Sequence, residues 1–267
     1  MIAPATHRTW HRPPWIASGT IRWTLTVTAV LYLALGIGSL DVNWVRISQG
    51  WERGWKFVIA FASPDFTTRW PDIQTGFIES LTMTVTATVT GVILSIPFAV
   101  GAAKNLAPGW IYLFCRSFIA LSRTLNEIIV AILLVAMFGF GPFAGYLTLT
   151  FATIGFMAKL LAEDIEEIDA SQLEALRATG AGFLQRLDFA VLSQVQPRLV
   201  GLSLYRLDIN FRESAVIGIV GAGGVGATLN TAMDRYEYDS AAAVILIIIA
   251  IVFATEYLSG LVRKRLQ

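Results

Sequence analysis

A glycine-rich run is the feature of this sequence that most resembles a chemical motif. Gly221-Ala222-Gly223-Gly224-Val225-Gly226 fits G-x-G-x-x-G, the pattern of dinucleotide-binding loops. That function requires a preceding β-strand and an acidic residue about 20 positions further on, whereas a long apolar segment precedes this run. We therefore predict a tight turn in which Gly221, Gly223, Gly224 and Gly226 allow close approach of the backbone. Its amides could also bind an anion in a nest.

Several charged residues lie inside apolar segments, where ionisable groups usually face a protein interior or an aqueous path. Arg206 lies near the middle of its segment, and an arginine fork can donate two hydrogen bonds to an oxyanion. Asp208 and Arg212 are four residues apart and can pair on one helix face. Two interpretations stay open, an internal ion-pair network or an anion pathway, whose candidate residues are Arg206, Arg212, Arg123 and Lys159.

A short segment between two apolar runs has helix-start and helix-stop signals. Ser171 and Glu174 have the spacing of a capping box, and Gly180 suits the left-handed residue that follows a helix. The pattern predicts a short, sharply bounded helix. A second helical stretch should follow and end before Pro197, with one apolar face formed by Phe183, Leu187 and Val191.

The sequence lacks the features that an enzyme or a metal protein would need. It contains no G-x-x-x-x-G-K-[ST] phosphate-binding loop, and its histidines, His7 and His11, lie outside the apolar runs. The single cysteine, Cys115, cannot form an internal disulfide and is expected to be a small buried residue. We therefore predict that the chain is not an enzyme and itself binds no metal or cofactor.

The composition of the chain is typical of an integral membrane protein. Of its 267 residues 55% are hydrophobic and 15% are charged, against about 45–50% and about 25% in soluble proteins. A helix crosses the hydrocarbon core with about 20 apolar residues. Six runs meet that need and predict an all-α polytopic bundle with six transmembrane helices: Ile21–Leu40, Ile78–Ala102, Trp110–Phe140, Pro142–Leu161, Pro197–Val220 and Ala241–Val262.

Two local patterns leave room for other interpretations. Thr82 to Thr90 alternates with apolar residues like a strand, but a membrane β-barrel would repeat that pattern many times, so we predict a helix. The third run carries polar residues and is expected to be broken, tilted or partly buried.

Basic residues near both ends of the chain set the predicted orientation. Both termini are expected in the cytoplasm, with the 162–196 loop inside and the 41–75 and 221–240 loops outside. A cleaved signal peptide over residues 1–40 is disfavoured, because its apolar run is too long. The 41–75 loop contains Trp44, Trp51 and Trp55 at helical spacing, which predicts an amphipathic helix in the outer membrane interface or an ordinary packed one. We expect three parts: residues 1–75, a core over 76–262 and a basic tail over 263–267.

The short helical segment and two further stretches of the sequence resemble a known family. Glu174-Ala175-Leu176, with Gly180 six positions after Glu174, is similar to the EAA motif of ABC importer permeases. Ala190 and Ser193 depart from that motif. Over residues 76–262 the chain resembles phosphonate-type permeases of the MetI-like fold, through three runs: Glu163 to Asp169, Glu174 to Gly182 and Gly218 to Gly226.

The resemblance implies an importer subunit in the bacterial plasma (inner) membrane, with no nucleic-acid partner. Two copies would form a homodimer and bind two ABC ATPase subunits, which carry ATP and Mg, and an extracytoplasmic phosphonate-type binding protein. The coupling helix that docks on the ATPase would comprise Ser171, Glu174, Ala175, Arg177, Ala178, Thr179 and Gly180. The glycine run would lie near the outer gate. Alternatives are import of another solute such as methionine, an ion-coupled secondary transporter, which would show inverted repeats, and a membrane-embedded enzyme.

Overall fold

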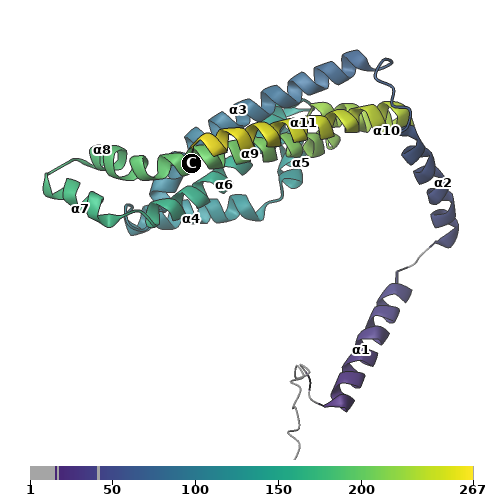
Figure 1. Cartoon of the computed structure of the whole chain (residues 1–267), viewed down its shortest axis with the longest axis horizontal. Coiled ribbons are helices and arrows are strands. Elements are labelled where there is room, and N and C mark those ends of the chain that lie inside the picture. The colour runs from purple at the N-terminus through teal and green to yellow at the C-terminus, as the bar shows by residue number, and fades with distance from the viewer. Residues whose placement is uncertain (1–15, 17, 41–42, 267) are drawn as a thin grey trace, which may run out of the picture. The chain divides into compact units, whose positions relative to one another are not determined.

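Helices form every regular element in the part of the chain that the structure, a computed structural model, describes: residues 16, 18–40 and 43–266 (Figure 1). The prediction of an all-α chain is confirmed. The chain divides into two compact units, residues 1–55 and 56–267. The threonine alternation lies in a helix, where Thr88 Oγ1 donates to the Thr84 carbonyl at 2.7 Å. Threonine hydroxyls bonded back to their own helix need no partner outside it.

The first unit holds one apolar helix and the start of a second. α1 (Gly19–Gly38) begins at Ser18, whose side chain accepts a hydrogen bond from the Ile21 amide, and its side chains are exposed. α2 (Trp44–Ala60) runs across the boundary between the units. The amphipathic helix expected in the 41–75 loop is therefore confirmed as a helix, and its position in a membrane interface stays a prediction.

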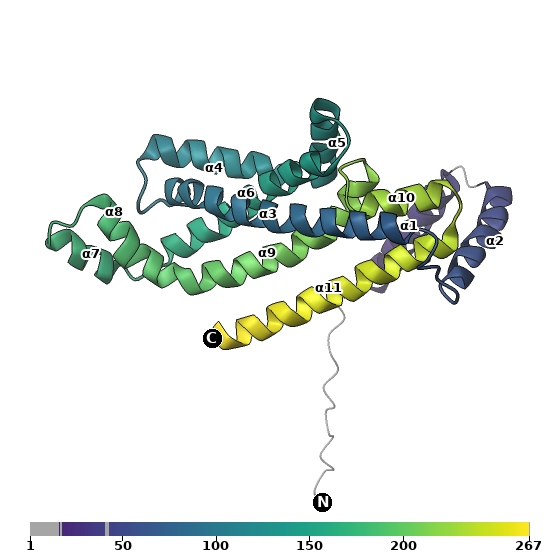
Figure 2. The same ribbon diagram turned by 90° about the horizontal axis from the view of Figure 1, so that it is seen from above.

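Three long helices form the centre of the second unit: α3 (Trp70–Ala102), α6 (Pro142–Glu166) and α9 (Ser193–Ile219). α3 makes its most extensive contact with α6, and both pack on α9 (Figure 2). Small side chains such as Ala99, Ala158 and Ala162 are fully buried between helices, which lets the backbones approach closely. Cys115 is buried in the same cluster, as expected. α10 (Val225–Asp234) and α11 (Tyr238–Leu266) cover α9.

The third predicted span is broken. α4 (Gly109–Thr124) and α5 (Glu127–Phe138) meet at an angle of 93°. Leu125 is extended, and the Asn126 side chain accepts from the Ile128 amide at 2.9 Å. Asn126 has the extended backbone of an N-cap, so α4 ends before it and α5 begins after it.

Four helices among the described residues are long and apolar enough to cross a membrane, and the bent pair α4–α5 makes a fifth. α9 has 27 residues, but its charged side chains set it apart from that group. The predicted six spans are compatible with this arrangement. Their ends differ, since α3 begins at Trp70 and α6 continues to Glu166.

Two local predictions between α6 and α9 are wrong. The short helix is α7 (Ala170–Ala178), and its N-cap is Asp169, not Ser171. The Asp169 carboxylate reaches the Ser171 amide at 2.9 Å and takes the place predicted for the capping box. The second helical stretch does not end before Pro197. α8 (Phe183–Arg186), a π-helix η1 (Leu187–Leu192) and α9 follow without a break, and Pro197 lies in the first turns of α9. The helix continues through Pro197 although the proline ring removes one backbone donor there.

Candidate functional site

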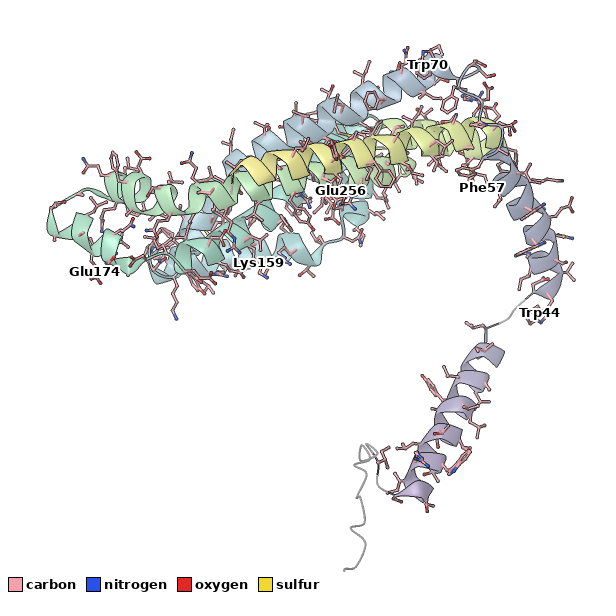
Figure 3. All side chains as sticks on the ribbon, viewed as in Figure 1. Trp44, Phe57, Trp70, Lys159, Glu174 and Glu256 are labelled. Carbon is pink, nitrogen blue, oxygen red and sulfur yellow. The ribbon has the colours of Figure 1, made fainter. Side chains whose placement is uncertain are left out.

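The α7–α8 hairpin presents a small, sharply bounded surface. Hydrogen bonds from the Gly180 amide to the Arg177 carbonyl and from the Ala181 amide to the Leu176 carbonyl, both 3.1 Å, end α7 in a Schellman motif. Gly180 has φ +77°, as predicted for this position. Leu173 is buried, whereas every residue predicted to dock is exposed: Ser171, Glu174, Ala175, Arg177, Ala178, Thr179 and Gly180. Glu174 lies on α7 (Figure 3).

Polar contacts fix this hairpin to the rest of the second unit. The Gln194 side chain accepts from the Asp169 amide at 3.0 Å and donates to Gln172 Oε1 at 3.2 Å. The Ser171 amide lowers the pKa of the Asp169 carboxyl by its hydrogen bond. The N-terminal end of α7 is therefore fixed to the start of α9, which gives its exposed surface a defined orientation.

Arg206 is held by a network inside the bundle. Its side chain is buried, and Nε donates to Thr153 Oγ1 at 3.1 Å while Nη2 donates to Glu213 at 3.1 Å. The guanidinium lies 5.3 Å from the centroid of the Phe156 ring. Asn210, fully buried, joins Thr153 to Thr88 on α3 through bonds of 2.9 and 2.8 Å.

A polar pocket of about 310 Å³ opens at the break between α4 and α5. Arg123 and Arg206 both line it, together with Glu127. Within the described ranges Arg123 has no hydrogen-bond or ion-pair partner, so its charge is available in the pocket. The structure thus brings together two of the four predicted pathway residues.

The other two predicted pathway residues lie away from this pocket. Lys159 pairs with Glu163 at 3.6 Å. Arg212 pairs with Asp208 at 2.7 Å, which confirms the predicted i,i+4 pair, and Thr255 also donates to Asp208 at 3.1 Å.

Sequence reasoning missed Asn210 and Glu127 as members of the polar sites. Asn210 lies four residues after Arg206, so the two side chains share one helix face. That spacing could have indicated Asn210 as a member of the buried polar network. Glu127 follows the cap at Asn126 and reaches the pocket through the bend, which no local pattern revealed.

One face of α9 is exposed in the single chain and carries charge. We call its exposed residues Arg198, Tyr205, Arg212, Val216 and Ile219 the α9 stripe. The Arg198 side chain is 62% exposed and that of Arg212 is 53% exposed. Charged side chains at membrane depth avoid lipid, so this α9 stripe requires protein or water beside it.

The glycine run forms a tightly packed turn. Gly221, Gly223 and Gly224 have φ between +75° and +94°, and the predicted need for glycine is confirmed. The Gly224 amide donates to Glu79 at 2.9 Å, and the Val225 amide donates to Ser80 at 2.9 Å. These two amides already have acceptors, which favours the packing interpretation over anion binding. In both ribbon views the run leads into α10, at the end of the second unit away from the α7–α8 hairpin (Figures 1 and 2).

Residues 91–267 match the family described as "Binding-protein-dependent transport system inner membrane component". The chain belongs to this family. A phosphate-import permease protein PhnE of Mycolicibacterium smegmatis is 43% identical over 204 residues, which are 76% of this chain and 38% of that protein. Two phosphite permeases of Stutzerimonas stutzeri, the putative HtxC and PtxC, are 33% and 38% identical. The matches cover 89% and 71% of this chain, and 84% and 70% of those proteins.

Solved structures of importer components share the fold. A chain of the inward-facing MetNI methionine ABC transporter aligns with a TM-score of 0.62 and 21% identity, over 72% of this chain and 94% of that one. A chain of an amino acid ABC transporter aligns with a TM-score of 0.59 and 18% identity, over 85% and 100%. The predicted MetI-like fold is confirmed, and the chain is an inner-membrane component of the binding-protein-dependent transport class.

Proposed function

We propose that the chain is the membrane-spanning subunit of an ATP-driven importer for a phosphorus oxyanion: phosphonate, phosphite or phosphate. The observation that supports this proposal most directly is the pocket at the α4–α5 break, which both Arg123 and Arg206 line. Two guanidinium groups suit an oxyanion because each can donate paired hydrogen bonds. The names of relatives at 33–43% identity point to phosphate and phosphite. The chain spans 38% of the length of the mycobacterial relative, so that protein's activity transfers only as a proposal.

The proposed pathway lies between two copies of this chain. The α9 stripe would face the second copy and remove its charges from lipid. Arg206 and Arg123 would contact the oxyanion, and Arg212 and Lys159 would raise the positive potential along the path. Gly221, Gly223, Gly224 and Gly226 would form a tightly packed outer gate.

ATP would be hydrolysed by two partner subunits that bind Mg and dock on α7. An extracytoplasmic binding protein would deliver the substrate and make most of the selection. In this arrangement the chain is not itself an enzyme. Methionine is the alternative cargo, but the methionine-type relative is 28% identical. An ion-coupled mechanism would leave the fixed, exposed α7 surface without a role.

Reconstituted transport tests this function. The complex with its binding protein should import phosphonate, phosphite or phosphate when ATP is present inside the vesicle. Binding of methionine by that binding protein, with none of the three oxyanions bound, would contradict the substrate class.

The proposed division into residues 1–75, 76–262 and 263–267, with both termini in the cytoplasm, predicts which side each loop faces. In a Cys115→Ala background, single cysteines at Ser63, Gln172 and Asp234 can be labelled in intact cells with an impermeant thiol reagent. All three positions are exposed in the structure. Labelling is expected at 63 and 234 and not at 172. Labelling of 172 from outside would invert the orientation and remove α7 from the ATPase side.

Gly180→Val is expected to disrupt ATPase docking while the protein still inserts. Valine at φ +77° is strained, since β-branched residues avoid this region, so the end of α7 must rearrange. We expect at least about a tenfold loss in co-purified ATPase subunit, which corresponds to roughly 1.4 kcal/mol. Gly182→Ala is the matched control, because the nearest atom to its added Cβ lies at 3.7 Å and its φ is negative. Equal co-purification and transport in both variants would contradict the coupling role.

A further inference from the structure

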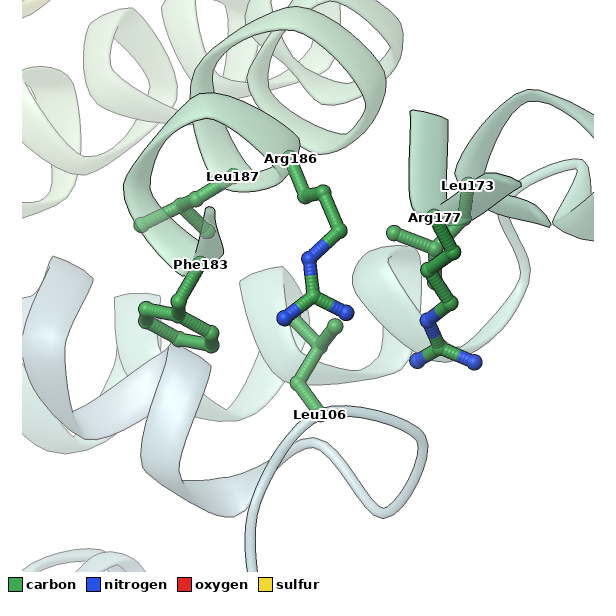
Figure 4. A pocket seen from close by; sticks show the side chains of 6 residues that line it. All are labelled: Leu106, Leu173, Arg177, Phe183, Arg186 and Leu187. Atoms are coloured by element: carbon green, nitrogen blue, oxygen red, sulfur yellow. The ribbon is translucent and has the colours of Figure 1, made fainter. Parts of the chain in front are cut away.

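A small pocket separates the two helices of the hairpin from the α3–α4 loop. It is lined by Leu106, Leu173, Arg177, Phe183, Arg186 and Leu187. Figure 4 shows the Arg177 side chain from α7 and the Arg186 side chain from α8 extending in the same direction, with Leu106 beside the Arg186 guanidinium. We call it the arginine pocket.

The arginine pocket contains positive charge without a counter-charge. Neither Arg177 nor Arg186 has an ion pair with any residue that the structure describes, and the lining contains no carboxylate. Arg186 Nε is buried and has no hydrogen-bond partner there. A buried donor without an acceptor is unfavourable, and two like charges in one pocket repel each other. The arrangement therefore favours an anionic acceptor from outside the chain.

Size restricts what that acceptor can be. The pocket has a volume of about 50 Å³, room for roughly three to five water molecules. A nucleotide is too large to enter. The charged end of one acidic side chain is small enough, and the apolar walls from Leu106, Leu173 and Phe183 suit its methylene groups.

We propose that an aspartate or glutamate side chain of the ATPase subunit occupies the arginine pocket and pairs with Arg177 and Arg186. This rests on the proposed docking of α7, and it adds a second contact on the side of the hairpin bounded by α8. Arg177 is exposed on the predicted docking surface, so the partner can reach it. Arginine forks bind carboxylates with paired hydrogen bonds.

The test is the affinity of purified ATPase subunit for the permease in lipid nanodiscs, measured over a range of salt concentrations. The double variant Arg177→Gln, Arg186→Gln should bind about tenfold or more weakly, because charge-assisted hydrogen bonds are lost, and with a flatter salt dependence. Arg186→Lys should keep the salt dependence. Lys104→Gln is the matched control, since Lys104 is an exposed cation on the neighbouring α3–α4 loop that does not line the pocket.

Charge reversal identifies the partner group. Arg186→Glu should weaken binding, and lysine in place of one acidic residue of the ATPase docking groove should restore it. Affinity and salt dependence of the double variant within twofold of the wild type would overturn the proposal and leave the docking of α7 intact. Absence of ATPase binding to the wild-type chain would instead contradict the proposed function. Inorganic phosphate that competes with the ATPase subunit on the wild type, but not on the double variant, would assign the pocket to a free anion.

Discussion

Arg206→Gln is expected to reduce both the stability of the permease and its transport rate. The substitution removes the 3.1 Å contacts to Thr153 and Glu213 and leaves the half-buried Glu213 carboxylate without its cation. Breaking a buried pair from one side costs roughly 3–5 kcal/mol, so a marked fall in the thermal stability of the detergent-solubilised protein should follow.

A second substitution separates stability from transport. In Arg206→Gln, Glu213→Gln the unpaired carboxylate is gone, and most of the lost stability should return. Transport should stay low, because the pocket still lacks one of its two guanidinium groups. Arg206→Lys should recover part of the rate, since a point charge lacks the paired donors. A stable double variant that transports at the wild-type rate would restrict Arg206 to a structural role.

Gly218→Ala is expected to separate α9 from the turn that leads into α10. An added Cβ would lie 2.6 Å from the Gly223 carbonyl oxygen, 2.7 Å from Gly226 Cα and 2.8 Å from the Ala227 amide nitrogen. All three are backbone atoms, so no side-chain rotation can relieve the clash. Overpacking of this kind costs about 1–3 kcal/mol or more, and we expect lower thermal stability and loss of ATPase-coupled transport.

Gly201→Ala in the same helix is the matched control. Apart from the backbone of its own helix and its chain neighbours, no atom lies within 4 Å of its added Cβ. Alanine is favoured over glycine in a helix by about 1 kcal/mol. Its stability should therefore equal or exceed that of the wild type. A Gly218→Ala protein as stable and active as Gly201→Ala would contradict the close packing of the glycine run.

Features encoded in short stretches of sequence were predictable. Long apolar runs located the helices, and polar residues within the third run indicated its break. The Asp208–Arg212 pair followed from i,i+4 spacing, and Gly180 from the conformation that only glycine adopts easily. Each of these depends on a few neighbouring residues.

Features that depend on distant contacts were not predictable. Asp169 and Ser171 are both good cap residues, and Gln194, from the start of α9, bonds to the Asp169 amide beside the cap that formed. Asp208 and Glu213 both follow Arg206 on α9. Arg206 pairs with Glu213 because its side chain is also held by Thr153 and Phe156 on α6. The π-helix before α9 and the continuation of the helix through Pro197 have no reliable marker in the sequence.

The uninterrupted path from α8 through η1 to α9 has a mechanical consequence. α9 alone has 27 residues, a length of about 40 Å, and no flexible loop separates it from the hairpin. A displacement of the hairpin is therefore transmitted to Arg206 and the α9 stripe along one continuous helical rod. The π-helix, whose hydrogen-bond register differs from that of α8 and α9, is the point where this rod is expected to change register. In the proposed complex, the compliance of the π-helix would set how much of each ATPase-driven movement reaches Arg206.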